Sequence, residues 1–597
     1  MRIHFPTNWQ GLDVRTVRLS YGSAVSQTHG FILRNAMKTG NAPRFPRLLV
    51  PRPLFLLLIC AFWLADVARA APFPQAYLKA SNTDPSDYFG LKVAISGHTM
   101  VVGAYGEDSS ATGVNGPGGD NNANAAGAAY VFVRTGTNWT QQAYLKASNT
   151  GEYDYFGLAV AISGDTIVIG APYEDSDARG VNGSGGNDNA NEAGAAYVFV
   201  RTGTNWTQQA YLKASNGEAG DEFGTAVAIS GNSIVVGAWR EDSDAFDSGA
   251  VYIFVRNGNS WSQQTYLKAS NCGAGDEFGE AVAISGDTIM VGASSEDSSA
   301  RGLNGNQNNE GAYNSGAAYV FVRNGTSWSQ QAYLKASNAE ADDRFGQGVA
   351  VDGDTAVAGA LSESSRARQV NGDQADNSAH HAGAAYVFAR NGTNWSQQAY
   401  LKAFNAEAWD AFGFPVGISG DTVVVGAQSE SSDGANAWNN NAFWAGAAYV
   451  FARGGTNWIQ HAYLKASNPG GGVSGLIAGD MFGGGLAISG DTVVVGAYLE
   501  DSDATGVNGD QSNNNAADSG TAYVFAGLGL GIFPDGLGGY AVRFKQTPGL
   551  SYRLLRAPEV TGVWNAIATN LANGLGIVSF HDTNAPPDRA FYHTAQP

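Results

Sequence analysis

The segment YFGLAVAISGDTIVIGAP, residues Tyr155–Pro172, decides the fold because closely similar segments recur along the chain. A long polar loop follows it, then GAAYVFVR at Gly194–Arg201, and the unit closes with NWTQQAYLKASN at Asn205–Asn216. Near-regular spacing of this kind indicates a repeat architecture. The Phe-Gly pair of the unit occurs seven times, in steps of 67, 67, 55, 67, 67 and 70 residues, at Phe89, Phe156, Phe223, Phe278, Phe345, Phe412 and Phe482.

Each unit predicts four β-strands. In the second unit we expect the first strand at Leu158–Ser163 and the second at Thr166–Ala171, with Gly164-Asp165 as a two-residue hairpin turn in which glycine supplies the positive φ. The third and fourth strands are expected at Ala195–Arg201 and Trp206–Ala214. Small and large apolar residues alternate along the first strand, which is typical of a sheet buried on both faces. Four-stranded sheets packed radially in this way make a β-propeller.

The two ends of the repeat array indicate a closed ring. The array begins with a segment of the fourth-strand type and ends with one of the third-strand type, Gly520–Phe525. Residues Ala76–Ser81 can therefore supply the missing outer strand of the last unit and leave no open sheet edge. We predict an all-β fold, a seven-bladed propeller of four-stranded blades whose last blade is closed by the N-terminal strand, followed by a small C-terminal β module.

Residues 1–70 predict a segment that is removed on export. The apolar run Leu54–Ala65 follows several arginines and precedes Ala68-Arg69-Ala70, as in a signal peptide that is cleaved after Ala70. Its 12 residues are fewer than the about 20 that span a membrane, so we expect no membrane span in the mature chain. Met1 and Met37 are both candidate starts, and a start at Met37 would make residues 1–36 an over-long extension. The expected location is secreted or cell-surface.

The rest of the chain divides into three parts by composition. Residues 71–526 hold the propeller repeats, and 527–539 (GLGLGIFPDGLGG) have the composition of a Gly-rich linker. Residues 540–597 predict a small C-terminal β module with short strands at Ala541–Lys545, Tyr552–Ala557, Trp564–Thr569 and Gly576–His581.

Charge and cysteine content narrow the classes of partner. The chain has a formal net charge of −19, and without residues 1–70, which hold nine basic and two acidic residues, the charge is −26. A strongly acidic protein is a poor match for nucleic acid or anionic lipid. Only Cys272 lies after residue 70, so the mature chain has no intramolecular disulfide. We expect a monomeric propeller with an extracellular protein or glycan as ligand.

Phe156-Gly157 followed by Gly170-Ala171-Pro172 resembles the FG-GAP repeat of integrin α-chain propellers and of many secreted bacterial proteins. The resemblance covers residues 76–526 and implies a binding or adhesion function, although only the second unit has the complete Gly-Ala-Pro. Integrin-type blades carry a calcium loop rich in Asp between the first two strands, where this chain has tight turns such as Ser-Gly-Asp. Such a turn cannot offer calcium its about six to eight oxygens. The family's usual metal sites are therefore not carried over. In the other units the proline position holds Tyr105, Trp239, Ser294, Leu361, Gln428 and Tyr498.

Two acidic positions recur in every unit, on the same face of the predicted disc. In one interpretation Asp accepts hydrogen bonds from turn amides while Glu anchors the long loop. In the other the carboxylates bind a cation, for which calcium is the candidate, or a cationic ligand. Asp precedes each Phe by two residues, at Asp87, Asp154, Asp221, Asp276, Asp343, Asp410 and Asp480. Glu follows each Phe by 18 residues, at Glu107, Glu174, Glu241, Glu296, Glu363, Glu430 and Glu500.

The long loops between the second and third strands open on the same face, which makes that face the candidate ligand surface. An alternative is that the Gly/Asn/Ser-rich loops are only solvated connections. We expect a non-enzymatic binding or adhesion protein, and the alternative function is an extracellular carbohydrate-active hydrolase or lyase on a propeller scaffold.

Catalytic motifs are sparse in this sequence. No histidine recurs at a repeat position, and His380-His381 is read as a solvated loop pair in preference to a metal site. The recurring tryptophans that open the fourth strands invite a sugar-platform interpretation, but packing is favoured because they occupy a framework position. These are Trp139, Trp206, Trp261, Trp328, Trp395 and Trp458.

Overall fold

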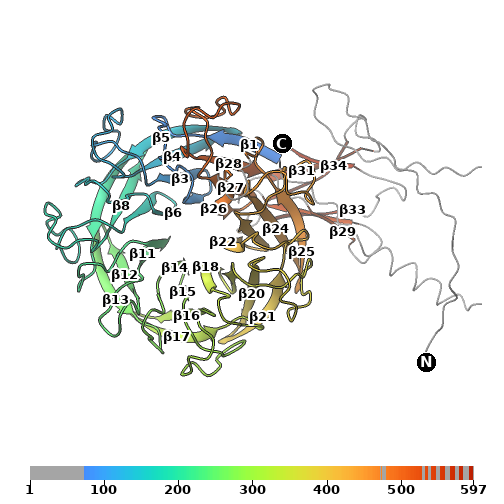
Figure 1. Ribbon diagram of the computed structural model, residues 1–597. Helices are drawn as coiled ribbons and strands as arrows, with labels where there is room; N and C mark the ends of the chain where they lie inside the picture. The colour runs from blue at the N-terminus through green and yellow to red at the C-terminus, as the bar shows by residue number, and fades with distance from the viewer. Residues whose placement is uncertain are drawn as a thin grey trace, which may run out of the picture. The chain divides into compact units, whose positions relative to one another are not determined.

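The computed structural model describes residues 73–470, 472 and 479–526, and six short strands after residue 530. It is an all-β, seven-bladed propeller in which every blade is a four-stranded antiparallel sheet, and the described residues contain no helix. Figure 1 shows the blades arranged in a ring. Among the described residues, no helix is long and apolar enough to cross a membrane. The predicted signal segment, residues 1–70, lies outside the described part of the chain.

The strands follow the repeat units. The innermost strands of blades one to seven are β2 (Val93–Ser96), β6 (Ala159–Ser163), β10 (Ala226–Ser230), β14 (Ala281–Ser285), β18 (Phe345–Asp352), β22 (Phe412–Ser419) and β26 (Phe482–Ser489). The second strands are β3 (Thr99–Ala104), β7 (Thr166–Ala171), β11 (Ser233–Ala238), β15 (Thr288–Ala293), β19 (Thr355–Ala360), β23 (Thr422–Ala427) and β27 (Thr492–Ala497). The third strands are β4 (Ala128–Thr135), β8 (Ala195–Thr202), β12 (Ala250–Asn257), β16 (Ala317–Asn324), β20 (Ala384–Asn391), β24 (Ala447–Gly454) and β28 (Thr521–Ala526). The outer strands are β5 (Asn138–Leu145), β9 (Asn205–Leu212), β13 (Ser260–Leu267), β17 (Ser327–Leu334), β21 (Asn394–Leu401), β25 (Asn457–Leu464) and, for blade seven, β1 (Phe73–Leu78).

The predicted closure of the ring is confirmed. Strand β1 pairs antiparallel with β28, with Tyr77 opposite Tyr523 and Leu78 opposite Ala522, so the N-terminal strand completes the seventh blade. A second set of bonds closes the ring at its centre. The backbone N–H of Gly97 in blade one donates to Ser489 Oγ of blade seven at 3.1 Å. The same bond, from a hairpin glycine to the last side chain of the preceding inner strand, recurs at Gly164, Gly231, Gly286, Gly353, Gly420 and Gly490.

The glycines of the repeat are required where neighbouring blades touch backbone to backbone. Gly157 has φ of +98°, and a Cβ placed on Gly103 of blade one would lie 2.0 Å from the carbonyl oxygen of Gly157 in blade two. No side chain fits at that distance, so both positions must be glycine. The adjacent Phe156 is fully buried, with its ring edge-on to Tyr197 at 5.3 Å. The Phe-Gly and Gly-Ala pairs thus set the spacing of the blades.

The propeller has two unlike faces. The turn face carries the two-residue turns that join the first and second strands. The loop face carries the Phe-Gly segments and the long loops between the second and third strands. A cavity of 270 Å³ lies between the seven inner strands and is lined by apolar residues such as Val160, Ile229 and Ile418.

Beyond the propeller, six strands form two three-stranded sheets, which fall largely in a compact unit of their own. The strand β29 (Gly531–Pro534) lies within the segment whose composition suggests a linker. The strands β30 to β33 overlap the four that the sequence predicts for the C-terminal module. These four are β30 (Tyr540–Lys545), β31 (Ser551–Ala557), β32 (Asn565–Leu571) and β33 (Ile577–Asp582), whereas β34 (Phe591–Ala595) was not predicted from the sequence.

Candidate functional site

The seven repeated glutamates are buried and bonded within the blades. In blade two Glu174 is 2% exposed and accepts hydrogen bonds from Lys213 Nζ, Tyr211 Oη and Asn149 Nδ2, each at 2.8 Å. Tyr211 lies near the end of the outer strand β9 of the same blade and Lys213 directly follows that strand, whereas Asn149 belongs to the segment that arrives from blade one. Each glutamate therefore joins three parts of the framework at one point.

The same lysine pairs with the glutamate in all seven blades. The Nζ to Oε2 distances lie between 2.6 and 3.0 Å. Burial lowers the pKa of Lys79, Lys146, Lys213, Lys335, Lys402 and Lys465, and the neighbouring glutamate opposes that shift. The sequence carries a signal for this partner, because the lysine of YLKASN recurs as often as the glutamate. The pairs are Lys79–Glu500, Lys146–Glu107, Lys213–Glu174, Lys268–Glu241, Lys335–Glu296, Lys402–Glu363 and Lys465–Glu430.

The seven repeated aspartates are also buried, and each accepts a backbone hydrogen bond from the turn that precedes it. Asp154 Oδ2 accepts the N–H of Gly151 at 2.8 Å. Burial raises the pKa of Asp154 to about 7, an effect that the backbone hydrogen bond opposes. Burial likewise raises the pKa to about 8 for Asp87 and Asp410, to about 7 for Asp276, Asp343 and Asp480, and to about 6 for Asp221.

These hydrogen bonds agree with the interpretation in which the aspartates accept bonds from turn amides and the glutamates anchor the long loops. An incoming cation at Glu174 would have to displace Lys213, which already neutralises it inside the blade. In the described residues, no group of three or more His, Cys, Asp or Glu side chains is arranged to hold a metal ion. The carboxylates therefore lie beneath the loop face, and a ligand on that face would meet other side chains first.

The long loops on this face are held by their own hydrogen bonds. In the loop of blade six, Asp433 accepts bonds from Asn439 Nδ2 at 2.8 Å and from Asn441 Nδ2 at 3.2 Å. These bonds lower the pKa of Asp433 to about 2. The Gly/Asn/Ser composition that would also suit a solvated connection thus forms ordered turns here.

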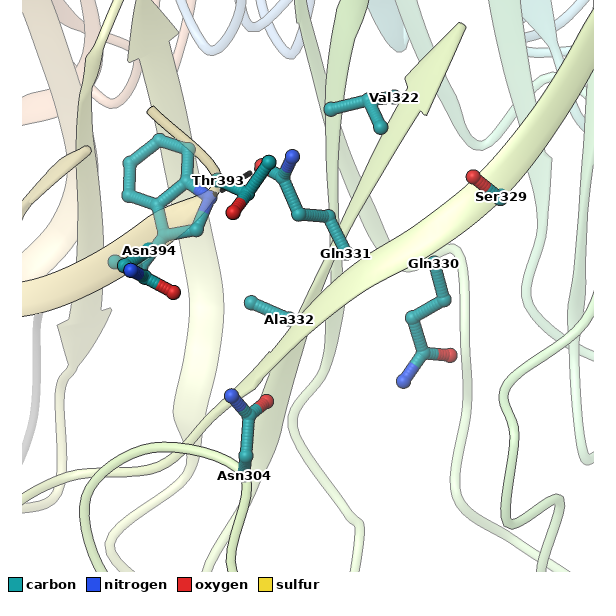
Figure 2. Close-up of a pocket in the computed structure, with 9 residues that line it drawn as sticks. Asn304, Val322, Ser329, Gln330, Gln331, Ala332, Thr393 and Asn394 are labelled. Carbon is teal, nitrogen blue, oxygen red and sulfur yellow. Dashed lines mark hydrogen bonds between the residues drawn. The ribbon is translucent and has the colours of Figure 1, made fainter. Parts of the chain in front are cut away.

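The recurring tryptophans pack between blades. Trp395 is 8% exposed and donates its Nε1–H to Gln331 Oε1 of the preceding blade at 2.8 Å. This pair borders a cavity of 490 Å³ between β17 and β21, where Figure 2 shows Gln330 and Gln331 leaving opposite sides of the strand. Because the same bond recurs around the ring, the cavity is part of the repeated framework. The other pairs are Trp139–Gln75, Trp206–Gln142, Trp261–Gln209, Trp328–Gln264 and Trp458–Gln398.

A chain of aromatic side chains runs along the loop face in blades one and two. The rings of Tyr88 and Tyr105 stack at 5.0 Å, Tyr105 meets Tyr155 at 5.5 Å, and Tyr155 meets Tyr173 at 5.0 Å. These four half-buried tyrosines are called the tyrosine arc below. Tyr105 occupies the position of the family proline, so this member of the arc could have been identified in the sequence as a departure from the repeat.

Charged side chains take the equivalent positions in blades three and four. Glu222 accepts a hydrogen bond from Trp239 Nε1 at 2.7 Å and pairs with Arg240 at 2.9 Å. Glu277 accepts a bond from Ser295, and Glu280 accepts one from Ser294. Together with the tyrosine arc, these residues make the loop face chemically different from one blade to the next.

The side chain of Lys92 in blade one reaches toward blades on the other side of the ring. Its Nζ lies 5.2 Å from the ring centre of Phe414 in blade six, and its charge interacts with Glu280 in blade four. Neither blade adjoins blade one, so the lysine side chain must lie near the axis of the ring. Lys92 therefore lies among groups of several blades, with the ring of Phe414 on one side and the carboxylate of Glu280 on another.

His380 and His381, which the sequence suggests to be a solvated loop pair, both contact an aromatic side chain of the next blade. Both rings stack with Trp409, with ring centres 5.8 Å and 4.6 Å from the indole and interplanar angles of 13° and 18°. Trp409 is 59% exposed. The contact joins the long loop of blade five to the segment that enters blade six, a pairing that spacing along the chain does not reveal.

Comparison with known families agrees with the repeat and the blade count. The FG-GAP repeat matches the chain at residues 73–132, 139–199, 206–254, 261–321, 328–388, 395–451 and 474–525. No curated protein matches the chain.

The buried aspartates predict a specific pH dependence. An aspartate whose pKa is raised in the folded state contributes stability below its unfolded pKa of about 4, and this is lost as the pH rises through the folded value. Asp154→Asn should therefore match the wild type below pH 4 and become more stable above it. One pKa unit corresponds to about 1.4 kcal/mol, so the difference should reach about 2 to 4 kcal/mol at pH 8.

Chemical denaturation of both proteins from pH 3.5 to 8.5 measures this difference. Asp244→Asn, in the exposed loop of blade three, is the matched control and should change the free energy of unfolding by less than about 0.5 kcal/mol across this range. A constant difference between Asp154→Asn and the wild type across this range would contradict the raised pKa.

Proposed function

Because the chain belongs to the FG-GAP repeat family, with seven repeats between residues 73 and 525, we propose that it is an exported binding or adhesion protein, not an enzyme. The ligand surface is the loop face of the propeller. The observation that carries the proposal is the contrast between two classes of residue on that face. Repeated carboxylates are buried and bonded to the framework, whereas half-buried side chains at the ends of the inner strands differ from blade to blade.

A ligand smaller than the ring contacts only a few blades, so residues that differ between blades determine where it sits. The tyrosine arc offers aromatic faces with one hydroxyl each, a combination that suits binding surfaces because it joins apolar area to a polar group. Arg240 of blade three lies near Tyr173, and its half-exposed guanidinium offers N–H donors of defined direction. An extracellular protein or a glycan fits this surface better than nucleic acid, because the chain is acidic.

The alternative, a carbohydrate-active hydrolase or lyase, would rest on Glu280. Burial raises the pKa of Glu280 to about 7, which is the range of a general acid at neutral pH. Glu280 also lies near Lys92, whose charge opposes that shift. We favour binding because the Glu280 carboxyl already accepts a bond from Ser294.

Binding can be tested with residues 71–597 on arrays of extracellular proteins and glycans. Tyr105→Ala combined with Tyr173→Ala removes half of the tyrosine arc and should weaken ligand binding at least tenfold, since aromatic contacts dominate such interfaces. The matched control is Gln428→Ala with Ser429→Ala, at the same repeat positions in blade six, which should bind as the wild type does.

Three outcomes of this experiment would count against the proposal. They are the absence of any ligand for the wild type, equal binding by both double variants, and turnover of a bound glycan that Glu280→Gln abolishes. The last would favour the enzymatic alternative.

The proposed export has its own test. When the full chain is produced in a secreting bacterial host, the protein in the exported fraction should begin at Ala71, because Ala68-Arg69-Ala70 fits signal peptidase cleavage. Mass spectrometry of the intact protein measures this end. Recovery of membrane-bound protein that retains Leu54–Ala65 would contradict the proposal.

A further inference from the structure

The stack of His380, His381 and Trp409, called the ring platform here, lies on the loop face where blades five and six meet. It is separate from the tyrosine arc of blades one and two. Trp409 donates its backbone N–H to the carbonyl of His380 at 2.8 Å, which holds the two segments side by side. All three rings are nearly parallel, so the platform presents flat aromatic surface, and the Trp409 side chain is 59% exposed.

The backbone of Trp409 is unfavourable for a tryptophan. Its φ is +74°, in the left-handed region that glycine occupies most easily. At the same repeat position, blades three and four carry Gly220 and Gly275, with φ of +89° and +81°. A bulky residue at such a position costs conformational energy, and here the exposed side chain recovers little of it by burial. Ser86, Tyr153 and Asp342 have the same backbone conformation at this repeat position, so the feature that distinguishes Trp409 is its stack with the two histidines.

The surroundings of the platform limit the charge of a ligand. Arg344 and Asp342 both act on the His381 ring, so one cation and one anion border the platform. Burial, His380 and Arg344 lower the pKa of His381, which favours the neutral ring. A polyanion is disfavoured by the net charge of −19, and a cationic ligand would meet Arg344 beside the rings. The ring platform therefore fits a neutral, flat ligand with hydroxyl groups at its edge.

A sugar ring has this chemistry. The C–H groups on one face of a pyranose pack against the negative face of an indole, and its hydroxyls can bond to a carboxylate and a guanidinium at the edge. We propose that Trp409, supported by His381 and His380, binds a neutral pyranose unit of a glycan. Asp342 and Arg344 supply the polar edge of that site. The inference rests on the proposed binding function and gives it a ligand class and a second position on the loop face.

The test uses residues 71–597 and a panel of neutral polysaccharides: cellulose, xylan, mannan, starch and dextran. Affinity electrophoresis should show that the wild type is retarded by at least one of them. Trp409→Gly should lose at least tenfold in affinity without a lower melting temperature, because glycine is better suited to the backbone at that position. A merely structural tryptophan would instead destabilise the protein when it is removed.

The matched control is Tyr153→Gly. Tyr153 has the same repeat position in blade two, a φ of +64° and 53% exposure, but no histidine stack. This variant should be retarded as strongly as the wild type. The inference is overturned if Trp409→Gly still binds, if Tyr153→Gly loses binding equally, or if no neutral polysaccharide retards the wild type. Ligand binding that still depends on Tyr105 and Tyr173 would then leave the proposed function intact.

Discussion

The buried pair between a lysine and a glutamate in every blade is the interaction on which the rest of the propeller depends. In blade two, Glu174 and Lys213 are 2% and 1% exposed and lie 2.8 Å apart. A buried ion pair stabilises a protein only when the remaining hydrogen-bonding positions are also filled, because removing charges from water is costly. Tyr211 and Asn149 fill positions around this pair. The pair thus links the outer strand, the exit of the second strand and the segment from the preceding blade.

Shared and variable positions of the repeat therefore have different structural roles. Positions that every blade shares hold the blades together, namely the Phe-Gly and Gly-Ala pairs and the lysine and glutamate, and six of the seven outer strands add a tryptophan. Positions that differ between blades carry the tyrosine arc, Lys92 and the ring platform. A repeat protein can change these positions one at a time without loss of the scaffold, since loops and strand ends on a rigid framework tolerate substitution. The proposed ligand recognition would therefore depend on the positions that differ between blades.

Much of the fold could be predicted from the sequence because a comparison of the seven units shows which positions they share. The second strand of blade two was predicted at Thr166–Ala171, where the structure has it. The sequence predicts the closing strand at Ala76–Ser81, but it spans Phe73–Leu78, because the backbone N–H of Lys79 bonds to the carbonyl of Gly506 in the long loop of blade seven instead of to β28. What could not be predicted is the contact of Lys92 with Phe414 and of Trp409 with the two histidines. These contacts join non-repeating residues from different blades, and spacing along the chain contains no signal for them.

The central claim, that the repeated carboxylates serve the framework through their lysines, can be measured with a double-mutant cycle at Glu174 and Lys213. We expect Glu174→Gln and Lys213→Met each to reduce the free energy of unfolding by about 3 to 5 kcal/mol, because each leaves an unpaired charge inside the blade. The double variant should recover a large part of that loss, with a coupling energy above about 1 kcal/mol. Single changes that each reduce stability by less than about 1 kcal/mol, and that simply add in the double variant, would contradict the claim.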